Sequence, residues 1–394
     1  MDFHIVIFSR LQSYDGGRET WMNMFLPLLK NSLEKSIINV YYFKDDKSDI
    51  DRMIKSFNDE RFQFFEINLP KIKNKFFSIF RILLFTKKAI YSINKNIKLE
   101  KDKQKSHILL GIGSFYEASV LSFFKLFHHK EGVKYIIWLR GVWAKETLAR
   151  HSGLIHRIII NTEKYFLRKA DKIIANGQDT SDAYKDYGFK SVVIPNALDF
   201  DKYKTFKDLR DVNVKKVSYI GRLSLEKGFL DFLKSVEVFN LKYPKLKDEI
   251  IFEVVGDGPL EKSLDSIKFN NFNYIGPINN ELIIDYLQTI DCGVALTYSN
   301  KALGGAGVSN GLLELMASGK LIVCWKAKVF QQVLNEESAI MVEESNIDEL
   351  IEGYLRLLKE PEYVRTLNEN AKKVSKKYSK ENHIKSFLEV IDEY

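Results

Sequence analysis

The sequence predicts an α/β protein built from two doubly wound parallel sheets. Short runs of β-branched and aromatic residues alternate with amphipathic stretches of helical length along nearly the whole chain, a pattern typical of strand–helix–strand units. This series occurs twice, before and after a charged, weakly patterned stretch that ends near Asp211. At 394 residues, the chain is long enough for two domains of about 150–200 residues, each with a full core.

The expected strands are short apolar runs bounded by turn residues. In the first half they are Ile5–Phe8, Ile38–Tyr42, Phe64–Ile67, Ile108–Gly111, Tyr135–Leu139, Lys172–Ala175 and Val192–Ile194. In the second half they are Lys216–Ile220, Ile250–Val255, Phe272–Ile275, Cys292–Leu296, Leu321–Cys324 and Ala339–Val342. Helices are expected between nearly all of them, as in Gly228–Tyr243, Pro259–Lys268, Asn280–Thr289 and Ile347–Leu358.

The domain boundary is expected after Pro195–Asp199, a turn-rich exit from a strand. This places a first domain at residues 1–199 and a second at 200–379. Residues 380–394 form an expected terminal helix with apolar residues at helical spacing, namely Ile384, Phe387, Leu388 and Ile391. Such a helix needs a surface to dock on, and we expect it to pack back on the first domain.

Composition is that of a globular protein and excludes disordered and fibrous classes, with 45% hydrophobic and 28% charged residues. The two cysteines, Cys292 and Cys324, lie in apolar surroundings and are expected to be buried, reduced thiols of a cytosolic protein. The chain enters a strand-like run directly after Met1, so no signal peptide is expected. No group of His, Cys and acidic residues has metal-ligand spacing, and we expect no bound metal; the pair Asp45-Asp46 is expected to be solvated.

The positive charge belongs to the first half of the chain. Residues 1–200 carry 33 Lys and Arg against 22 Asp and Glu, whereas residues 201–394 carry 27 against 30. Within the first half, Lys71–Lys88 alternates cations with aromatic residues, and Phe123–Lys130 repeats the pattern. A basic aromatic segment of this kind favours contact with an anionic membrane surface. A core helix with a solvated lysine face remains the alternative, and no nucleic-acid motif accompanies the charge.

The segment from Gly304 to Lys320 carries the strongest sign of a ligand site. It joins a glycine-rich loop to a helix that is expected to begin at Asn310 and to contain a single acidic residue, Glu314. Free amides and the positive end of the helix dipole favour a diphosphate, and a carboxylate one turn further on can accept hydrogen bonds from a ribose. A glycine-bearing turn in any α/β protein remains the alternative reading of this segment.

Three further strand ends in the second half carry related features. The first is Gly221–Gly228, where Arg222 and Lys227 flank a glycine-bounded loop and could neutralise a diphosphate. The next strand ends in Val255-Gly256-Asp257-Gly258-Pro259, and another in Tyr274-Ile275-Gly276-Pro277-Ile278. Because open α/β sheets bind ligands at the carboxyl ends of their strands, we expect these loops to form one site.

The order and spacing of these motifs resemble the retaining glycosyltransferases of family 4, which have the GT-B fold of two Rossmann-like domains facing a central cleft. The second half carries this resemblance most specifically, from the first motif at Gly221 to the end of the last at Gly319. The first half resembles the family more loosely, through Asp15–Thr20, Ala170–Asn176 and Pro195–Asp199. The resemblance thus covers nearly the whole chain.

The resemblance implies roles for particular residues. Arg222 and Lys227 would hold the donor diphosphate and stabilise the charge that develops on it, and Glu314 would bind the ribose. The remaining donor-binding positions would be Gly16 and Gly17 from the first domain, with Gly256, Ile278, Gly307, Val308, Ser309 and Asn310 from the second. Ile278 would present its backbone to the base.

Two positions depart from the family pattern. A second glutamate usually stands eight positions before the one on the helix, where it meets sugar hydroxyls, but this chain has Ala306. A histidine often precedes the glycine after the fifth strand, whereas here the pair is Arg140-Gly141. We expect Arg140 to supply a donor or acceptor contact in its place. The first departure leaves the identity of the donor sugar open.

The resemblance implies a metal-independent hexosyltransferase that moves a sugar from a nucleotide diphosphate-sugar, UDP favoured over GDP, to an acceptor with retention. The acceptor would be a lipid-linked glycan of a bacterial surface polysaccharide, reached by a cytoplasmic enzyme on the inner face of the plasma membrane. No other cofactor and no nucleic acid partner are expected. Two alternatives remain: a nucleotide-sugar epimerase of the same fold, and a non-catalytic partner subunit of a glycosyltransferase complex.

Overall fold

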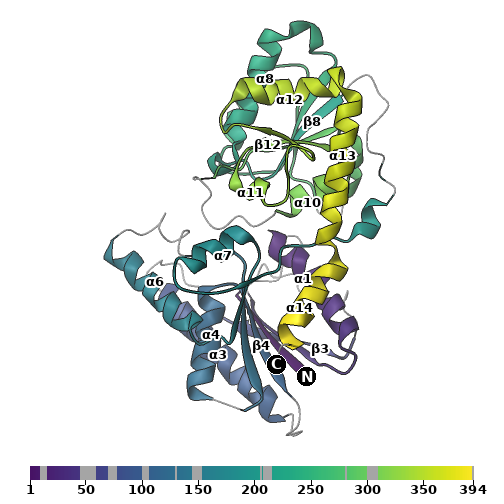
Figure 1. The fold of residues 1–394 in the computed structure, drawn as a ribbon. Coiled ribbons are helices and arrows are strands. Elements are labelled where there is room, and N and C mark those ends of the chain that lie inside the picture. Colours follow the sequence, from purple (N-terminus) through teal and green to yellow (C-terminus); the bar gives the residue numbers. More distant parts are fainter. Residues whose placement is uncertain are drawn as a thin grey trace. The chain divides into compact units, whose positions relative to one another are not determined.

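The structure is a computed structural model that describes residues 1–8, 16–44, 59–69, 78–99, 106–128, 131–143, 153–204, 206, 215–279, 282–299 and 309–392. It divides into two compact units (Figure 1). The first unit combines Met1–Pro195 with Ile384–Tyr394, and the second contains Asn196–His383. Each is an α/β unit with one parallel sheet.

The first unit has a seven-stranded sheet in the order β3-β2-β1-β4-β5-β6-β7, and every neighbouring pair of strands is parallel. Its strands are β1 (Asp2–Ile7), β2 (Ile38–Lys44), β3 (Phe62–Asn68), β4 (His107–Ile112), β5 (Val133–Leu139), β6 (Lys172–Ala175) and β7 (Val192–Val193). The described helices are α1 (Gly16–Ser32), α3 (Ser78–Leu99), α4 (Phe115–Phe127), α6 (Leu154–Leu167) and α7 (Gln178–Lys185), with part of α14 (Lys380–Asp392).

Helices cover both faces of the first sheet. Successive strand residues point to opposite sides, and because both sets of side chains are apolar, each face needs a covering layer. On β1, Phe3 and Ile5 join a core with α1 and α14, whereas Val6 joins a core with α3, α4 and α6 (Figure 1). Phe387 of α14 stacks on Trp138 of β5, with ring centroids 5.3 Å apart. The carboxyl-terminal helix is thereby part of the first unit's core.

The second unit has a six-stranded parallel sheet in the order β10-β9-β8-β11-β12-β13. Its strands are β8 (Lys215–Ile220), β9 (Ile250–Val255), β10 (Phe272–Gly276), β11 (Cys292–Ala295), β12 (Leu321–Trp325) and β13 (Ile340–Val342). The α-helices are α8 (Phe229–Lys242), α9 (Ile283–Thr289), α10 (Asn310–Ala317), α11 (Lys328–Gln331), α12 (Ile347–Lys359) and α13 (Pro361–Ser375). Short 3₁₀ segments are η2 (Phe200–Tyr203), η3 (Leu225–Lys227), η4 (Pro244–Leu246), η5 (Glu261–Ser266) and η6 (Lys376–Tyr378).

The two faces of the second sheet differ in polarity. Tyr219 of β8 packs against Phe229 and Phe232 of α8, with ring centroids 5.2 and 5.5 Å apart. On the opposite face, Ser218 shares a 2.7 Å hydrogen bond with the hydroxyl of Tyr286 on α9, and that hydroxyl donates to Glu253 of β9. The buried Glu253 carboxylate is therefore hydrogen-bonded, as a charge buried in a core must be.

All thirteen predicted strands are present, with end points that differ by at most a few residues. The helix predicted over Pro259–Lys268 is wrong in type, because the structure has the 3₁₀ segment η5 there. The amide of Leu260 donates a hydrogen bond to the carbonyl of Leu223, on the loop after β8. The amide of Ser263 donates to the carbonyl of Leu260, and the hydroxyl of Ser266 donates to the carbonyl of Ser263. Such competing bonds disfavour a regular α-helix.

The chain crosses between the two units at two places, near residues 195 and 383, and the backbone segments at these crossings pair with each other. The amide of Leu198 donates to Tyr378, and the amide of Lys380 donates back to Leu198. The Lys380 ammonium also lies 2.6 Å from the Asp199 carboxylate. These contacts place residues 196–199 with the second unit, four residues earlier than the boundary expected from the sequence.

Candidate functional site

The predicted site residues of the second unit lie on loops at the carboxyl edge of its sheet. Because all six strands are parallel, the loops after β8, β9, β10 and β11 leave the same edge. The strand order reverses between β8 and β11, which are hydrogen-bonded neighbours. In open α/β sheets the position of this reversal is called the topological switch point, and it creates a crevice in which ligands bind. The geometry therefore favours a site at the ends of β8 and β11.

Lys227 lies at this crevice, in the last turn of η3 after β8. Its ammonium group donates a 3.3 Å hydrogen bond to the hydroxyl of Thr297, which follows β11. Burial lowers the pKa of the Lys227 ammonium group, and the nearby Glu226 carboxylate partly opposes this effect. The amide of Tyr298 donates to the carbonyl of Glu226 at 3.1 Å, so the two loops are joined by backbone as well. A half-buried cation is thus held across the switch point, where an anionic ligand would offset its desolvation.

Arg222 is exposed and belongs to the same loop as Lys227. The buried hydroxyl of Tyr219 lies 2.8 Å from the carbonyl of Arg222 and 3.2 Å from that of Lys227, and it donates to both. One side chain of β8 therefore fixes the backbone at both predicted diphosphate-binding residues. The guanidinium group itself extends from this anchored backbone toward solvent.

Gly256 packs directly on the neighbouring loop. Its φ is +129°, and a Cβ atom added there would lie 2.0 Å from the carbonyl oxygen of Gly221. Gly258 behaves similarly, because a Cβ there would lie 2.5 Å from the carbonyl oxygen of Leu223. The glycines of this turn are thus required by the close approach of two backbones, whereas the sequence suggested a role for Gly256 at the ligand. A ligand contact at Gly256 stays a prediction.

Ile278 lies just beyond the end of β10, and its side chain is half-buried. The hydroxyl of Tyr274 donates to the carbonyl of Gly256 at 3.1 Å, which ties the end of β10 to the loop after β9. β10 is at the edge of the sheet, two strands from β8. Ile278 is therefore further from the switch point than Lys227 is, and its contact with a base stays a prediction.

Helix α10 begins at Asn310, as the sequence predicts, with Ser309 as its N-cap. The Ser309 hydroxyl accepts a 3.2 Å hydrogen bond from the amide of Leu312. Gly307 and Val308, together with Ala306, lie outside the described residues. The described part of this motif therefore supplies the helix start and its cap, to which the dipole argument for a diphosphate applies.

Glu314 lies one turn into α10 and is only partly exposed. Burial raises the pKa of its carboxyl group to about 7, and the charge of Lys202 on η2 partly opposes this effect. Glu314 in turn helps to raise the pKa of Tyr203, although burial is the larger cause there. At neutral pH, Glu314 is thus poised between its charged and neutral forms, and hydrogen-bond donors such as ribose hydroxyls would favour the charged form.

The raised pKa of Glu314 predicts a pH-dependent stability. Because the folded state holds a proton that the unfolded state has lost, the free energy of unfolding should fall as pH rises from about 4.5 to 7. Glu314→Gln removes this titration and should be more stable than the wild type above pH 7, by at most about 3 kcal/mol. Urea unfolding at pH 5 and pH 8 measures the difference. Glu369→Gln on the exposed face of α13 is the control, and a Glu314→Gln curve parallel to wild type would contradict the shift.

In the first unit, the structure brings α1 and Arg140 together. Gly16 and Gly17 are the first residues of α1, and Arg140 follows β5 directly. The Arg140 guanidinium carbon lies 4.5 Å from the ring centroid of Trp21, which is on the second turn of α1. Stacking on an aromatic ring holds the planar guanidinium in place, so Arg140 is positioned beside the helix that carries the two glycines. Its contact with a ligand stays a prediction.

Several residues with a positioning role were not singled out from the sequence. Thr297 directly follows the predicted strand Cys292–Leu296, so its place at a strand end was a usable signal. Glu117 also had a usable signal, because Ser114 and Glu117 form the Ser-x-x-Glu capping box at the start of α4. Its carboxylate accepts hydrogen bonds from the amides of Phe8 and Ser114, at 2.8 and 3.0 Å, and so joins the ends of β1 and β4.

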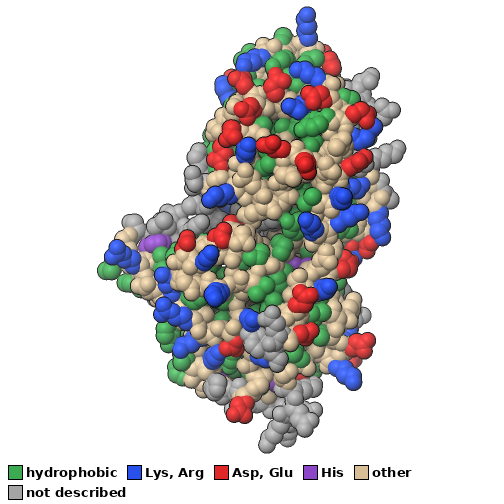
Figure 2. Space-filling model, in the orientation of Figure 1, with side chains coloured by type: hydrophobic (Ala, Val, Ile, Leu, Met, Phe, Trp, Pro, Cys, Tyr) green, Lys and Arg blue, Asp and Glu red, His purple; other side chains and the backbone are tan. Residues whose placement is uncertain are grey.

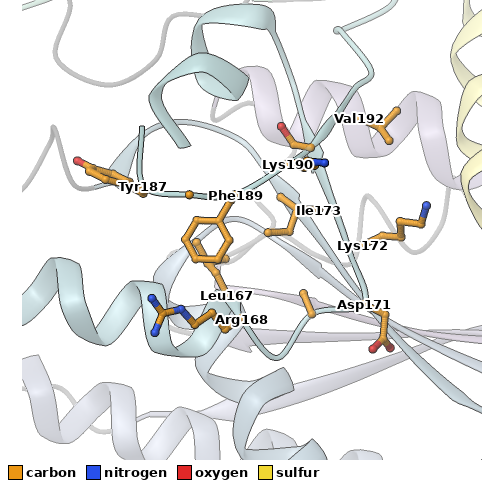
Figure 3. A pocket seen from close by; sticks show the side chains of 12 residues that line it. Leu167, Arg168, Asp171, Lys172, Ile173, Tyr187, Phe189, Lys190 and Val192 are labelled. Atoms are coloured by element: carbon orange, nitrogen blue, oxygen red, sulfur yellow. The ribbon is translucent and has the colours of Figure 1, made fainter. Parts of the chain in front are cut away.

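A cavity of about 550 Å³ lies elsewhere in the first unit, at the amino end of β6 and β7 (Figure 3). Arg168, Lys172 and Lys190 contribute cations to its lining, while Phe189 and Ile173 contribute apolar surface. None of the predicted site residues lines this cavity. The cavity is therefore at the opposite edge of the first sheet from the carboxyl ends of β6 and β7.

Within the part of the chain that the structure describes, no group of three or more His, Cys, Asp or Glu side chains is arranged to hold a metal ion. The described helices also include none with the length and apolarity needed to cross a bilayer. Cys292 and Cys324 are both buried, and burial raises the pKa of each thiol.

The basic aromatic segments of the first half divide between core and surface. Residues 71–77, 129 and 130 lie outside the described residues. In α3, Phe85 is buried while Lys87 and Lys88 are exposed, which is the arrangement of a core helix with a solvated lysine face. In α4, Phe124 is buried and Phe127 is exposed.

Comparison with known families identifies both halves of the chain. Residues 201–374 match the family model "Glycosyl transferases group 1", and residues 56–202 match "Glycosyltransferase Family 4". Among curated relatives, an uncharacterized glycosyltransferase of Haemophilus influenzae is 24% identical over 77% of this chain and 82% of its own length. The alpha-monoglucosyldiacylglycerol synthase of Acholeplasma laidlawii is 28% identical over 44% of this chain and 43% of its own. An uncharacterized glycosyltransferase of Methanocaldococcus jannaschii is matched over only 60% of its length.

Solved structures share the fold at low sequence identity. Sucrose-phosphate synthase from Thermosynechococcus elongatus superimposes with a TM-score of 0.72 at 14% identity, over 100% of this chain and 99% of the other. Anabaena HepE, solved in complex with UDP-glucose, gives a TM-score of 0.71 at 14% identity over the whole of both chains. With two family models that together match residues 56–374 and two parallel α/β sheets in agreement, the chain belongs to glycosyltransferase family 4 and has the GT-B fold.

Proposed function

We propose that the protein transfers a hexose-type sugar from a UDP-sugar to a lipid-linked glycan acceptor, with retention of the anomeric configuration. The observation that carries this proposal is the half-buried ammonium group of Lys227, held against Thr297 at the reversal of strand order. A cation with a lowered pKa at a switch point is suited to a diphosphate leaving group. Arg222, on the same anchored loop, adds a second positive charge.

In the proposed reaction, the bond between the anomeric carbon and the donor phosphate oxygen breaks as the acceptor hydroxyl oxygen bonds to that carbon from the same face. The acceptor proton passes to the departing phosphate. Arg222 and Lys227 stabilise the negative charge that develops on the diphosphate, and Glu314 accepts hydrogen bonds from the ribose. Electrostatic stabilisation by groups already in place would supply most of the rate enhancement, without a metal ion.

The choice of UDP is supported by relatives of the same fold. Anabaena HepE has been solved with UDP and with UDP-glucose, and it matches this chain over its whole length. The choice of a lipid-linked acceptor is supported by a glycolipid synthase among the relatives and by a lipopolysaccharide outer core galactosyltransferase among the structures. The positive charge of residues 1–200 suits an acceptor on the inner face of a plasma membrane.

Nucleotide binding tests the donor directly. A ligand that binds only the folded state at 100 times its Kd stabilises that state by about 2.7 kcal/mol. For a unit of this size, UDP and the correct UDP-sugar should therefore raise the Tm by about 5–10 °C, and GDP should raise it less. The measurement is a thermal-shift series over a panel of nucleotide-sugars. No shift with any nucleotide, in protein shown to be folded, would contradict the proposal.

Ala306 favours one alternative, a non-catalytic partner of a glycosyltransferase complex, because the family usually has a sugar-binding glutamate at this position. Such a protein would bind nucleotide weakly or not at all and would release no UDP from any UDP-sugar. Isothermal titration with UDP, followed by an assay of UDP release in the presence of a lipid-linked acceptor, separates the two. Release that depends on the acceptor would also exclude an epimerase, which acts on the donor alone.

A further inference from the structure

Helix α6 exposes apolar side chains along one face. Leu154, Ile155, Ile158 and Tyr165 are exposed to 73%, 57%, 56% and 45%. Leu154, Ile158 and Tyr165 are spaced by four and seven residues, so they share one side of the helix. Another side packs into the core of the first unit through Phe166 and Leu167. The helix therefore buries one apolar side and exposes a second apolar strip to solvent.

Positive charge surrounds this strip. Arg157 and Arg168 are exposed at the two ends of the helix. The ammonium group of Lys169 lies 5.5 Å from the ring centroid of Tyr165, which places a cation beside the strip. The acidic residue of α6, Glu163, is buried and accepts a 2.7 Å hydrogen bond from the hydroxyl of Tyr184. Figure 2 shows hydrophobic and basic side chains together over the region that α6 occupies in Figure 1.

The basic character continues beyond the end of the helix. Arg168 is also part of the lining of the cavity in Figure 3, together with Lys172 and Lys190. The acidic residue of this lining, Asp171, is held by the Lys125 ammonium group at 2.5 Å and by the amide of Tyr135 at 2.9 Å. Its negative charge is thus already offset, and the cavity rim carries the same sign of charge as the helix.

We infer that this α6 surface, composed of Leu154, Ile155, Ile158, Tyr165, Arg157, Arg168 and Lys169, docks on an anionic lipid bilayer. Exposed aliphatic side chains bordered by arginine, lysine and tyrosine match the boundary between headgroups and acyl chains, where apolar burial and attraction to anionic lipid act together. A second copy of the chain fits less well, because a symmetric contact would place like charges at Arg157 and Arg168 opposite each other.

This inference deepens the proposed function, since it names the surface through which the enzyme would reach a lipid-linked acceptor. It also differs from the segments that the sequence singled out, Lys71–Lys88 and Phe123–Lys130. The described parts of those segments also expose apolar side chains, Leu83 to 56% and Phe127 to 73%. On α6, however, three exposed apolar side chains, Leu154, Ile158 and Tyr165, share one side of a single helix and are bordered by cations, which makes this strip available to a bilayer.

Sedimentation of the full-length protein with vesicles tests the inference. The probes are vesicles of phosphatidylcholine alone and vesicles that also contain phosphatidylserine. We expect binding to the anionic vesicles that weakens as salt is added, and weak binding to the neutral ones. Leu154→Ser with Ile158→Ser should lower the partition coefficient about tenfold or more, and Arg157→Glu with Arg168→Glu should do the same.

The matched control is Leu241→Ser with Lys247→Glu, which removes an equally exposed leucine and an exposed lysine from the second unit and should leave vesicle binding unchanged. Equal binding by the control and both α6 variants would overturn the inference. Concentration-dependent dimerisation that the α6 variants abolish, without vesicle binding, would assign the surface to a second copy and would also overturn it.

The same variants separate this inference from the proposed function. If α6 docks on lipid, the variants lose vesicle binding and keep the Tm shift that UDP causes in the wild type. Vesicle binding without any nucleotide-induced shift would reject the proposed function and retain the docking surface. A normal shift with no vesicle binding by the wild type would reject the docking surface and retain the donor site.

Discussion

Replacing Lys227 with alanine is expected to lower turnover by about 100- to 1,000-fold, because removal of one preorganised group that stabilises developing charge has effects of this size. Lys227 supplies the cation of η3, and Thr297 holds its ammonium group at the switch point. Arg222→Ala should reduce turnover to a similar extent. The double variant should lose less than the product of the two effects if both groups act on one diphosphate.

The measurement is the initial rate of UDP release with a UDP-sugar and a lipid-linked acceptor. Lys227→Ala should unfold at the wild-type urea concentration or above it, because it removes a cation that burial disfavours. Lys247→Ala, which removes an exposed lysine of the same unit, is the control and should retain full activity. Near-wild-type turnover of Lys227→Ala would contradict its assignment as a diphosphate ligand.

Gly256→Ala is expected to cause the largest loss of stability among the loops of the candidate site. Its Cβ atom would lie 2.0 Å from the backbone oxygen of Gly221, and its φ of +129° is one that residues with a side chain rarely adopt. Strain and overpacking of this kind together cost about 3 to 5 kcal/mol. Urea unfolding of the variant and the wild type measures the difference in the free energy of unfolding.

Gly311→Ala is the matched control for this prediction. Gly311 is the second residue of α10, and a Cβ atom there meets nothing within 4 Å. Because alanine loses less backbone entropy than glycine on adopting a helical conformation, this variant should be at least as stable as the wild type. If Gly256→Ala were as stable as Gly311→Ala, the close packing of the loops after β8 and β9 would be refuted.

The central strands were predictable because they are buried on both faces. A central parallel strand such as β9 (Ile250–Val255) is a continuous apolar run bounded by turn residues, and it is too short to be confused with a helix of about ten or more residues. The segment after β9 was predicted less well. Whether Pro259–Lys268 forms an α-helix or the 3₁₀ segment η5 depends on the hydrogen bond from Leu260 to Leu223, which joins two loops that follow different strands.

The candidate site was predictable as a set of loops, and less so as a set of contacts. Arg222, Lys227 and Glu314 were identified by their position after strands or at a helix start, which local sequence reveals. Thr297 and Tyr219, which hold the first two in place, act through hydrogen bonds between neighbouring strands and loops. The sequence suggested that Gly256 makes room for a ligand. In the structure, the need for glycine at this position comes from the carbonyl oxygen of Gly221, which lies too close for a side chain.

The sequence by itself determined the alternation of strands and helices, the family and the residues that could meet a diphosphate, because these are local patterns of polarity and turn chemistry. Tertiary structure decided how those residues are held and how their charges behave. The lowered pKa of Lys227, the pKa of about 7 at Glu314 and the apolar strip on α6 all depend on what surrounds each side chain. Burial is a property of the packed fold, and no stretch of sequence contains it alone.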